Sequence, residues 1–206
     1  MRGRFITLEG GEGVGKSTQA HMLAQALEAR GTRPLLTREP GGTPGAEAIR
    51  ALLLDPAQSF GPASETLLFA AARADHVAKA IEPALAEGRW VVCDRFLDST
   101  RAYQGGEGGL TDTDICTLHA IGSRGLLPDL TLLLSAAPDQ VAERLAARDG
   151  DSSDRIGGRP ADYHRAVAAR FAALASLDPQ RFRVIEATGS PAEVHARIMA
   201  EVEALA

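Results

Sequence analysis

The chain carries, close to its start, the stretch Gly10-Gly11-Glu12-Gly13-Val14-Gly15-Lys16-Ser17, which matches the pattern G-x-x-x-x-G-K-[ST] in full. An apolar run at residues 5–8 precedes it, and residues 20–27 follow with the apolar spacing of a helix. In a strand–loop–helix unit of this kind, backbone N–H groups converge on phosphate oxygens at the positive end of a helix. The stretch therefore predicts a nucleoside triphosphate site, with Lys16 on the β and γ phosphates and Ser17 on Mg²⁺. By itself it does not separate a kinase from a GTPase or a motor ATPase.

Four more short apolar runs alternate with longer helical patterns along the chain. They lie at residues 34–37, 90–93, 130–134 and 182–185. Like the run at 5–8, they lack polar alternation, which predicts strands that are buried on both faces. Ser190-Pro191-Ala192-Glu193 forms a capping box with proline at the first helical position and opens the last helix. We therefore predict an α/β fold of the P-loop NTPase type in one domain over residues 1–206. Its five-stranded, mostly parallel sheet has helices on both faces and ligands beyond the carboxyl ends of its strands.

Composition excludes several classes of function. The chain has 206 residues, of which 45% are apolar and 24% charged, and a net charge of -5, so we expect a soluble globular protein that binds no nucleic acid. We also expect no membrane association, because no apolar run approaches the length that crosses a bilayer. The first residues lack a signal-peptide core, and two cysteines do not make a disulfide framework, which together predict a cytoplasmic location.

Three further segments suggest a second phosphate and a base. Arg38 follows the predicted strand 34–37, and Asp94 and Arg95 follow the run 90–93, where an arginine can hold a phosphate and an acid can reach a metal. Phe69 and Arg73 are four residues apart and so share one helical face, where an aromatic ring can stack on a base. Each segment also has a purely structural interpretation: a turn with a solvated arginine, a surface ion pair and a core aromatic.

The order and spacing of these motifs resemble those of bacterial thymidylate kinases over nearly the whole chain. The resemblance rests on residues 9–18, on Thr37-Arg38-Glu39-Pro40-Gly41-Gly42, on Phe69-x-x-x-Arg73, on Asp94-Arg95-Phe96 and on Ser99-Thr100-Arg101-Ala102-Tyr103-Gln104-Gly105. It implies an enzyme that moves the γ-phosphate of ATP to dTMP with Mg²⁺, giving dTDP and ADP for dTTP synthesis and DNA replication. It also implies a homodimer.

The resemblance assigns roles to individual residues. ATP binding falls to Gly10, Gly11, Glu12, Gly13, Val14, Gly15, Lys16, Ser17, Thr18 and Arg144. In dTMP binding, Glu12 is expected to bind the 3′-hydroxyl, and Arg38 and Arg95 the phosphate. Phe69 is expected to stack on thymine, Arg73 to donate to its O4, and Thr100 and Gln104 to lie near the base. Tyr103 is expected to crowd a ribose 2′-hydroxyl. Ser17 and Asp94 are the expected metal residues, and the expected catalytic set is Lys16, Asp94, Arg95 and Arg148.

Water must be kept from the transferred phosphate, which predicts a lid. The arginine-rich segment at about residues 144–160 is the candidate, with a solvated loop as the alternative. Arg148 is expected to touch the transferred phosphate, Arg155 is the second choice, and Arg144 is expected to pack on adenine. Many members of the family continue with acidic residues where this chain has Ile156-Gly157-Gly158-Arg159-Pro160, so the resemblance does not assign the detailed contacts of the lid.

Two other functions compete with this interpretation. One is a kinase for dUMP, UMP, CMP or AMP, because a thymine methyl group contributes only about 1–3 kcal/mol in a pocket. The other is a P-loop switch or regulatory ATPase, against which stand the additional arginines and the lack of a guanine-binding N-K-x-D segment. The apolar pattern from Pro62 to Leu85 fits either a dimer face or a core that faces the sheet.

Overall fold

The computed structural model describes residues 2–106, 108–137, 139–141, 144 and 155–205. Within them, five strands form one parallel sheet in the order β2-β3-β1-β4-β5. The strands are β1 (Phe5–Glu9), β2 (Leu35–Arg38), β3 (Val91–Asp94), β4 (Leu130–Ser135) and β5 (Phe182–Glu186). Each predicted strand is present within one residue of its expected ends, so the predicted α/β fold is confirmed.

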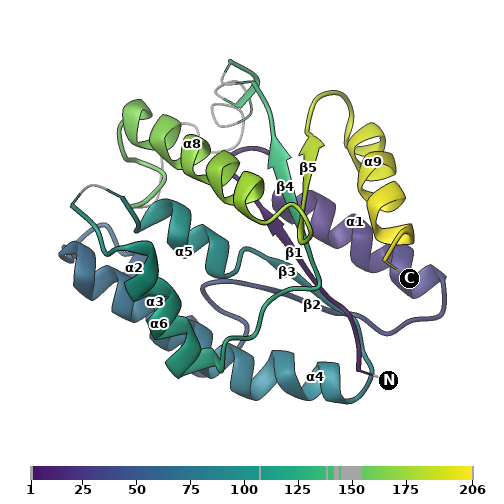
Figure 1. Cartoon of the computed structure of the whole chain (residues 1–206), viewed down its shortest axis with the longest axis horizontal. Helices are drawn as coiled ribbons and strands as arrows, with labels where there is room; N and C mark the ends of the chain where they lie inside the picture. Colours follow the sequence, from purple (N-terminus) through teal and green to yellow (C-terminus); the bar gives the residue numbers. More distant parts are fainter. Residues whose placement is uncertain (1, 107, 138, 142–143, 145–154, 206) are drawn as a thin grey trace.

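Helices cover both faces of the sheet (Figure 1). The first face is covered by α1 (Lys16–Ala29) and α9 (Pro191–Glu203), which pack against each other and share one apolar core with β1, β3 and β4. The opposite face is covered by α3 (Pro62–His76), α4 (Glu82–Ala86), α5 (Leu97–Tyr103), α6 (Asp112–Ser123) and α8 (Ala161–Leu177), with α2 (Pro44–Leu54) packed on α3. No helix among these described residues is long and apolar enough to cross a membrane.

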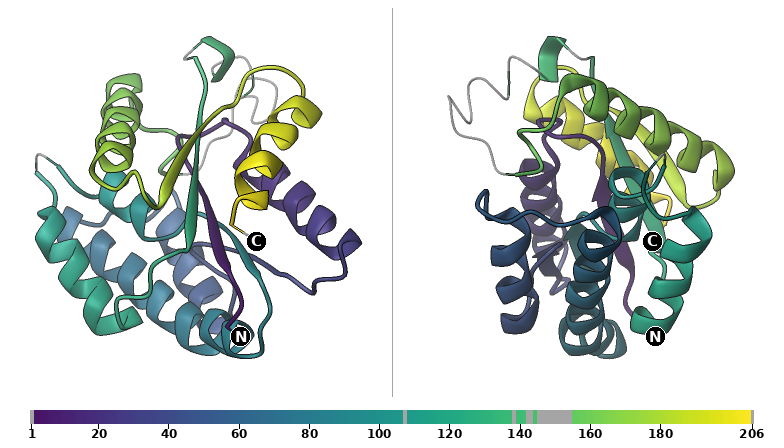
Figure 2. Two further views of the ribbon diagram at one scale, coloured as in Figure 1. Left: turned by 45° about the vertical axis from the view of Figure 1, so that its right-hand side comes forward. Right: turned by 90° about the vertical axis from the view of Figure 1, so that its left-hand side faces the viewer.

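Side chains of β1 alternate between the two faces, as the period of a strand requires. Ile6 and Leu8 enter the core under α1 and α9, whereas Phe5 packs in the core on the other side. Glu9 shares the face of Phe5 and meets the start of α5. A carboxylate is therefore buried at the carboxyl end of the central strand, while the N-terminus lies at the opposite end of the sheet (Figure 2).

The prediction that all five strands are buried on both faces is wrong for the two edge strands. β2 is only partly buried, and Val184 in β5 is 61% exposed. An edge strand has one neighbouring strand, so fewer groups surround its side chains than surround those of a central strand. The central strands β1, β3 and β4 are buried as predicted.

The apolar pattern from Pro62 to Leu85 forms α3, a π-helical turn at Val77–Ile81, and α4. The wider turn comes just before Pro83, which has no N–H and would clash with the carbonyl four residues earlier in an ordinary helix. Val77, Ile81 and Leu85 pack into the core beside Phe5 and Val91. The pattern was predicted to be either a dimer face or a core that faces the sheet. The second interpretation therefore holds for residues 77–85.

A buried ion cluster ties α5 to the start of β5. Asp98 is fully buried, and its carboxylate accepts hydrogen bonds from Arg181 at 2.5 and 3.2 Å and from Arg101 at 3.1 Å. Arg181 also donates to Thr131 in β4 at 2.8 Å. The cluster holds the helix that carries Thr100 and Tyr103 at a set height above the sheet.

Substituting Asp98→Ala is expected to lower the free energy of unfolding by about 2–3 kcal/mol, because it removes the buried carboxylate that accepts from the Arg181 guanidinium and leaves that group with its ion pair to the partly exposed Asp178. Urea unfolding at fixed protein concentration measures this. The control is Asp112→Ala, which removes the exposed partner of Arg101 and should cost less than about 1 kcal/mol. An equal loss of unfolding free energy in the two variants would contradict a special role for the buried Asp98–Arg181 pair.

Candidate functional site

A cavity of about 560 Å³ opens at the carboxyl ends of β1, β2 and β3. Strand register brings their last residues together, since Asp94 pairs with both Leu8 and Arg38. Most of the residues predicted for the site line this one cavity: Glu12, Gly13, Gly15, Lys16, Ser17, Thr18, Arg38, Phe69, Arg73, Asp94, Arg95, Thr100, Tyr103, Gln104 and Arg144. Gly10, Gly11 and Val14 do not line it. Arg148 and most of the predicted lid lie outside the described residues.

The phosphate loop depends on two of its glycines for different reasons. Gly10 has φ +134°, and a Cβ there would lie 2.4 Å from the carbonyl oxygen of Leu134. Gly15 has φ +96°, and a Cβ there would meet no protein atom within 4 Å. The open space beside Gly15, at the start of α1, leaves the backbone accessible to a phosphate.

Lys16 is buried at the base of the loop, and its Nζ donates to the carbonyl oxygen of Gly11 at 2.5 Å. Burial, together with the nearby Arg95 charge, lowers the pKa of Lys16 to about 8. A polyphosphate beside it would favour the charged ammonium. The lysine is thus placed as a cation whose charge a bound anion would stabilise.

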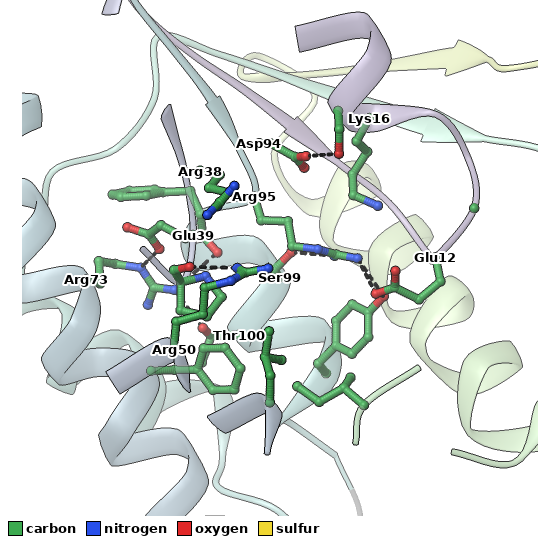
Figure 3. A pocket seen from close by; sticks show the side chains of 18 of the residues that line it. Glu12, Lys16, Arg38, Glu39, Arg50, Arg73, Asp94, Arg95, Ser99 and Thr100 are labelled. Carbon is green, nitrogen blue, oxygen red and sulfur yellow. Dashed lines mark hydrogen bonds and ion pairs between the residues drawn. The ribbon is translucent and has the colours of Figure 1, made fainter. Parts of the chain in front are cut away.

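Asp94 and Ser17 meet beside the loop (Figure 3). The Ser17 hydroxyl donates to Oδ2 of Asp94 at 2.5 Å. The other carboxylate oxygen of Asp94 is buried and has no hydrogen-bond partner among the described residues. A hydroxyl and an incompletely bonded carboxylate are oxygen donors of the kind that Mg²⁺ prefers, so this pair fits the predicted metal.

Arg95 lies at the centre of the cavity with its backbone in the left-handed region, at φ +70°. Its guanidinium donates to Glu12 at 2.5 Å, to the Tyr103 hydroxyl at 3.2 Å and to Ser99 at 3.0 Å. Burial alone would lower the pKa of Arg95, but the charges of Glu12 and its neighbours raise it above its usual range. The Glu12 carboxylate also accepts from the Tyr103 hydroxyl at 3.2 Å. These contacts join three of the predicted acceptor residues in one network.

Arg38 is held less firmly than Arg95. Its side chain is largely exposed, and it lies 3.4 Å from the Glu47 carboxylate. Both guanidinium groups nevertheless line the same cavity as Lys16 (Figure 3).

Glu9 lies under Arg95 and was not among the predicted site residues. Its carboxylate accepts from the backbone N–H of Phe96 at 2.8 Å and from the Ser99 hydroxyl at 2.6 Å. It thereby fixes the turn in which Arg95 takes its left-handed backbone, a conformation that costs a non-glycine residue about 1–2 kcal/mol. Burial, and next the charge of Asp98, raise the pKa of Glu9 to about 8.

Arg73 is held from three sides at the other end of the cavity. Its Nε donates to Glu39 at 2.7 Å, and one terminal nitrogen donates to the Thr100 hydroxyl at 2.7 Å and to the Phe96 carbonyl at 3.2 Å. Phe69 lines the cavity while its ring also packs against the apolar cluster around Tyr103 and Phe171. Both the functional and the core interpretations of Phe69 therefore describe part of its environment.

Sequence reasoning also missed Glu39, Arg50 and Ser99, which line the same cavity. Arg50 projects from α2 and donates to the Pro40 carbonyl at 2.7 Å. Glu39 lies inside the quoted Thr37–Gly42 motif and Ser99 begins the quoted Ser99–Gly105 motif, so these two motifs were the available signals. For Arg50, nothing in the local pattern of α2 distinguishes it from a solvated helical arginine.

Three arginines of the predicted lid can be placed, and one of them, Arg159, donates to the Glu65 carboxylate at 2.8 and 3.0 Å. Arg144 donates to the Ala187 carbonyl at 2.9 Å and lines the cavity. Arg155 donates to the Leu53 carbonyl at 2.9 Å and lies 2.6 Å from the Glu65 carboxylate, so in this structure it is directed to helix α3.

Comparison with known proteins gives one consistent result. The family model described as thymidylate kinase matches residues 8–198. A thymidylate kinase of Rhizorhabdus wittichii is 59% identical, covering 100% of this chain and 98% of its own, and one of Chromohalobacter salexigens is 52% identical, covering 97% and 95%. The crystal structure of thymidylate kinase from Ehrlichia chaffeensis superposes with a TM-score of 0.81 at 32% identity, covering 98% of this chain and 100% of its own.

The pKa of Glu9 predicts a pH-dependent stability. Its pKa is about 8 in the folded chain against 4.5 as the ordinary value, so the folded state holds an extra proton between these pH values and loses stability as pH rises. Glu9→Gln removes this term. The free energy of unfolding of the variant relative to the parent should therefore increase by roughly 1 kcal/mol per pH unit from pH 5.5 to 8. Urea titrations at several pH values measure it, and a constant difference would contradict the burial argument.

Proposed function

The chain belongs to the thymidylate kinase family, and we propose that it moves the γ-phosphate of ATP to dTMP with the residues of this cavity in separate roles. The observation that carries the proposal is that one cavity joins a phosphate loop, two further arginines and a base-sized end with Phe69 and Arg73. A hydrolytic switch has no use for the second set of groups. We treat residues 1–206 as one kinase domain, with a lid at about 144–160.

The donor phosphates are assigned to the loop. Backbone N–H groups of residues 10–18 surround them, and Lys16 neutralises charge on the β and γ phosphates. Arg144 is assigned to adenine, and its position in the cavity lining beside Ala187 supports this. Arg148 stays our first choice for the lid arginine that meets the transferred phosphate.

The acceptor phosphate is assigned to Arg38 and Arg95. Two anionic phosphates repel each other, and these arginines with Lys16 offset that repulsion where charge shifts during transfer. Arg95 is prepositioned by Glu9, whereas the exposed Arg38 is free to adjust to the substrate. The acceptor oxygen is already anionic, so no strong general base is required.

The nucleoside is assigned to the remaining groups. Phe69 stacks on thymine, Arg73 donates to O4, and Glu12 accepts from the 3′-hydroxyl after exchanging part of its contact with Arg95. Tyr103, which lines the cavity, is assigned to crowd a ribose 2′-hydroxyl and so to favour the deoxy sugar. Thr100 acts mainly through Arg73, because its hydroxyl accepts from that guanidinium.

Mg²⁺ is the cofactor that the residues fit. Ser17 and Asp94 would hold it, with Asp94 acting directly or through water, and bound Mg²⁺ would neutralise phosphate charge. No cluster of three or more histidine, cysteine or acidic ligands occurs among the described residues, which suits an ion held largely by phosphates and water. Both cysteines are free, which suits a cytoplasmic enzyme.

The proposal is tested by ADP release from Mg-ATP with dTMP, dUMP, UMP, dCMP, CMP, AMP and GMP supplied singly. We expect dTMP to give the highest kcat/KM and hydrolysis without acceptor to be negligible. In Phe69→Ala, KM for dTMP should rise about 10- to 100-fold with Mg-ATP binding unchanged, because stacking on a base is worth roughly 1–3 kcal/mol. Another preferred acceptor would overturn the base assignments, and acceptor-independent turnover would favour a switch.

We further propose a homodimer through the layer of α2, α3 and α6. These helices pack on one another and present exposed Leu52, Leu67 and Ile121. Burial of large apolar side chains against a second copy would be worth about 25 cal/mol per Å² before the costs of association.

Substituting Leu67→Glu together with Ile121→Glu is expected to shift the protein from dimer to monomer in light scattering after gel filtration. Each change places a charge in a face that must lose water to associate. Leu177→Glu is the matched control, because Leu177 on α8 is as exposed as Ile121, at 77%, but lies outside this layer. If the dimer persists in the Leu67→Glu and Ile121→Glu variant but is lost in Leu177→Glu, the interface involves α8 and not this layer.

A further inference from the structure

Glu65 has no role in the proposed division of the cavity, yet three side chains converge on it. It is a residue of α3 that is only 3% exposed. Its carboxylate accepts from Gln104 Nε2 at 2.9 Å and from Arg159 Nη2 at 2.8 and 3.0 Å, and Arg155 Nη2 lies 2.6 Å away. The three partners come from the end of α5 and from residues 155–159, so the cluster joins segments far apart in the sequence.

The two arginines keep Glu65 ionised. Burial alone would raise the pKa of this carboxyl, but the hydrogen bond from Gln104 and the charges of Arg155 and Arg159 lower it below its usual value. An ionised carboxylate only accepts hydrogen bonds. The Gln104 atom that contacts the Glu65 carboxylate must therefore be the amide nitrogen. If the amide were rotated by half a turn, its carbonyl oxygen would face the carboxylate, and both groups are acceptors.

This orientation decides what Gln104 offers to the cavity that it lines. With Nε2 bound to Glu65, the carbonyl oxygen is the free branch of the amide, and it takes part in no hydrogen bond among the described residues. Arg159 also secures the neighbouring backbone, since it donates to the Tyr163 hydroxyl at 2.5 Å, which donates to the Tyr103 carbonyl at 2.7 Å. The amide and the backbone that carries it are held by the same arginine.

Arg73 provides the complementary group nearby. Glu39, Thr100 and the Phe96 carbonyl take its Nε and one terminal nitrogen, and the guanidinium only donates. The base end of the cavity thus presents a fixed donor and a fixed acceptor. A pyrimidine with a 4-carbonyl and an N3–H matches this pair, whereas a 4-aminopyrimidine offers the reverse pattern.

We propose that Glu65 is a positioning residue that sets base specificity: held by Arg155 and Arg159, it orients the Gln104 amide so that the cavity accepts a 4-oxo and rejects a 4-aminopyrimidine nucleotide. The inference rests on the proposed function and adds a residue that does not touch the substrate. A site that hydrogen-bonds a base strongly disfavours an analogue that leaves buried groups unpaired.

The test is Glu65→Gln, which keeps the shape but lets position 65 meet either end of the Gln104 amide. The ratio of kcat/KM for dTMP over dCMP should fall about 10- to 100-fold, the effect of one misdirected buried hydrogen bond. KM for dTMP should rise, with kcat and Mg-ATP affinity little changed. Glu82→Gln, the same chemical change at a partly exposed ion pair with Arg124, is the control and should keep the parent ratio.

A double-mutant cycle separates positioning from a general loss of structure. In a Gln104→Met background, Glu65→Gln should change the dTMP to dCMP ratio by less than about twofold, because the group through which Glu65 acts is gone. The inference would be overturned if the two substitutions changed the dTMP to dCMP ratio additively, or if Glu65→Gln alone kept the ratio of the parent enzyme. If Glu65→Gln does not fold, Arg159→Gln decides by the same cycle, with a smaller loss expected because Arg155 remains.

The two proposals fail in different ways. A parent enzyme that does not prefer dTMP over the other monophosphates contradicts the proposed function itself. A parent enzyme that prefers dTMP, together with a Glu65→Gln variant that keeps the full preference over dCMP, contradicts only the role of Glu65.

Discussion

A cavity for two phosphorylated nucleotides must hold several cations close together in a poorly solvated place before any anion arrives. Like charges a few ångströms apart repel strongly where water is excluded. This chain meets the constraint with carboxylates placed behind its cationic and polar groups. Glu12 pairs with Arg95, Glu39 with Arg73, and Glu65 with Arg155 and Arg159. Glu9 holds the turn that carries Arg95. The rest of the site depends on these carboxylates, because each fixes the direction of a side chain that lines the cavity.

The parallel sheet explains why a few residues at the ends of its strands are enough to build the cavity. Its strands end at one edge, so the phosphate loop, Arg38 and Asp94 are neighbours by register. Helices α3 and α5 then bring the groups that we propose for the base to the same cavity. Side chains built on such elements are held more accurately than side chains on loops. The buried pair of Asp98 and Arg181 extends this rigidity from the sheet to α5.

Most of the fold and the donor site could be predicted from local patterns. Apolar runs marked the strands, and Ser190 with Glu193 formed the capping box that begins α9. The burial of the edge strands could not be predicted, because a run such as 182–185 does not reveal how many neighbours it will have. The residues predicted for the acceptor, which line one cavity, could be named only because the spacing of several motifs resembled a known family. Considered alone, Arg38 fitted a solvated turn as well as a phosphate site, and the pattern around Phe69 favoured a core aromatic.

What the sequence by itself determined is therefore the local chemistry: a loop whose glycines, lysine and serine suit a polyphosphate, and strands whose ends carry Arg38, Asp94 and Arg95. Those features arise from residues adjacent in the chain, where pattern and geometry are linked directly. Tertiary structure alone decided the partners of these groups. Glu9 meets Ser99 across 90 positions, and Glu65 meets Arg159 across 94. A buried glutamate has no local signature that names its partner, because the pairing exists only once distant elements have packed together.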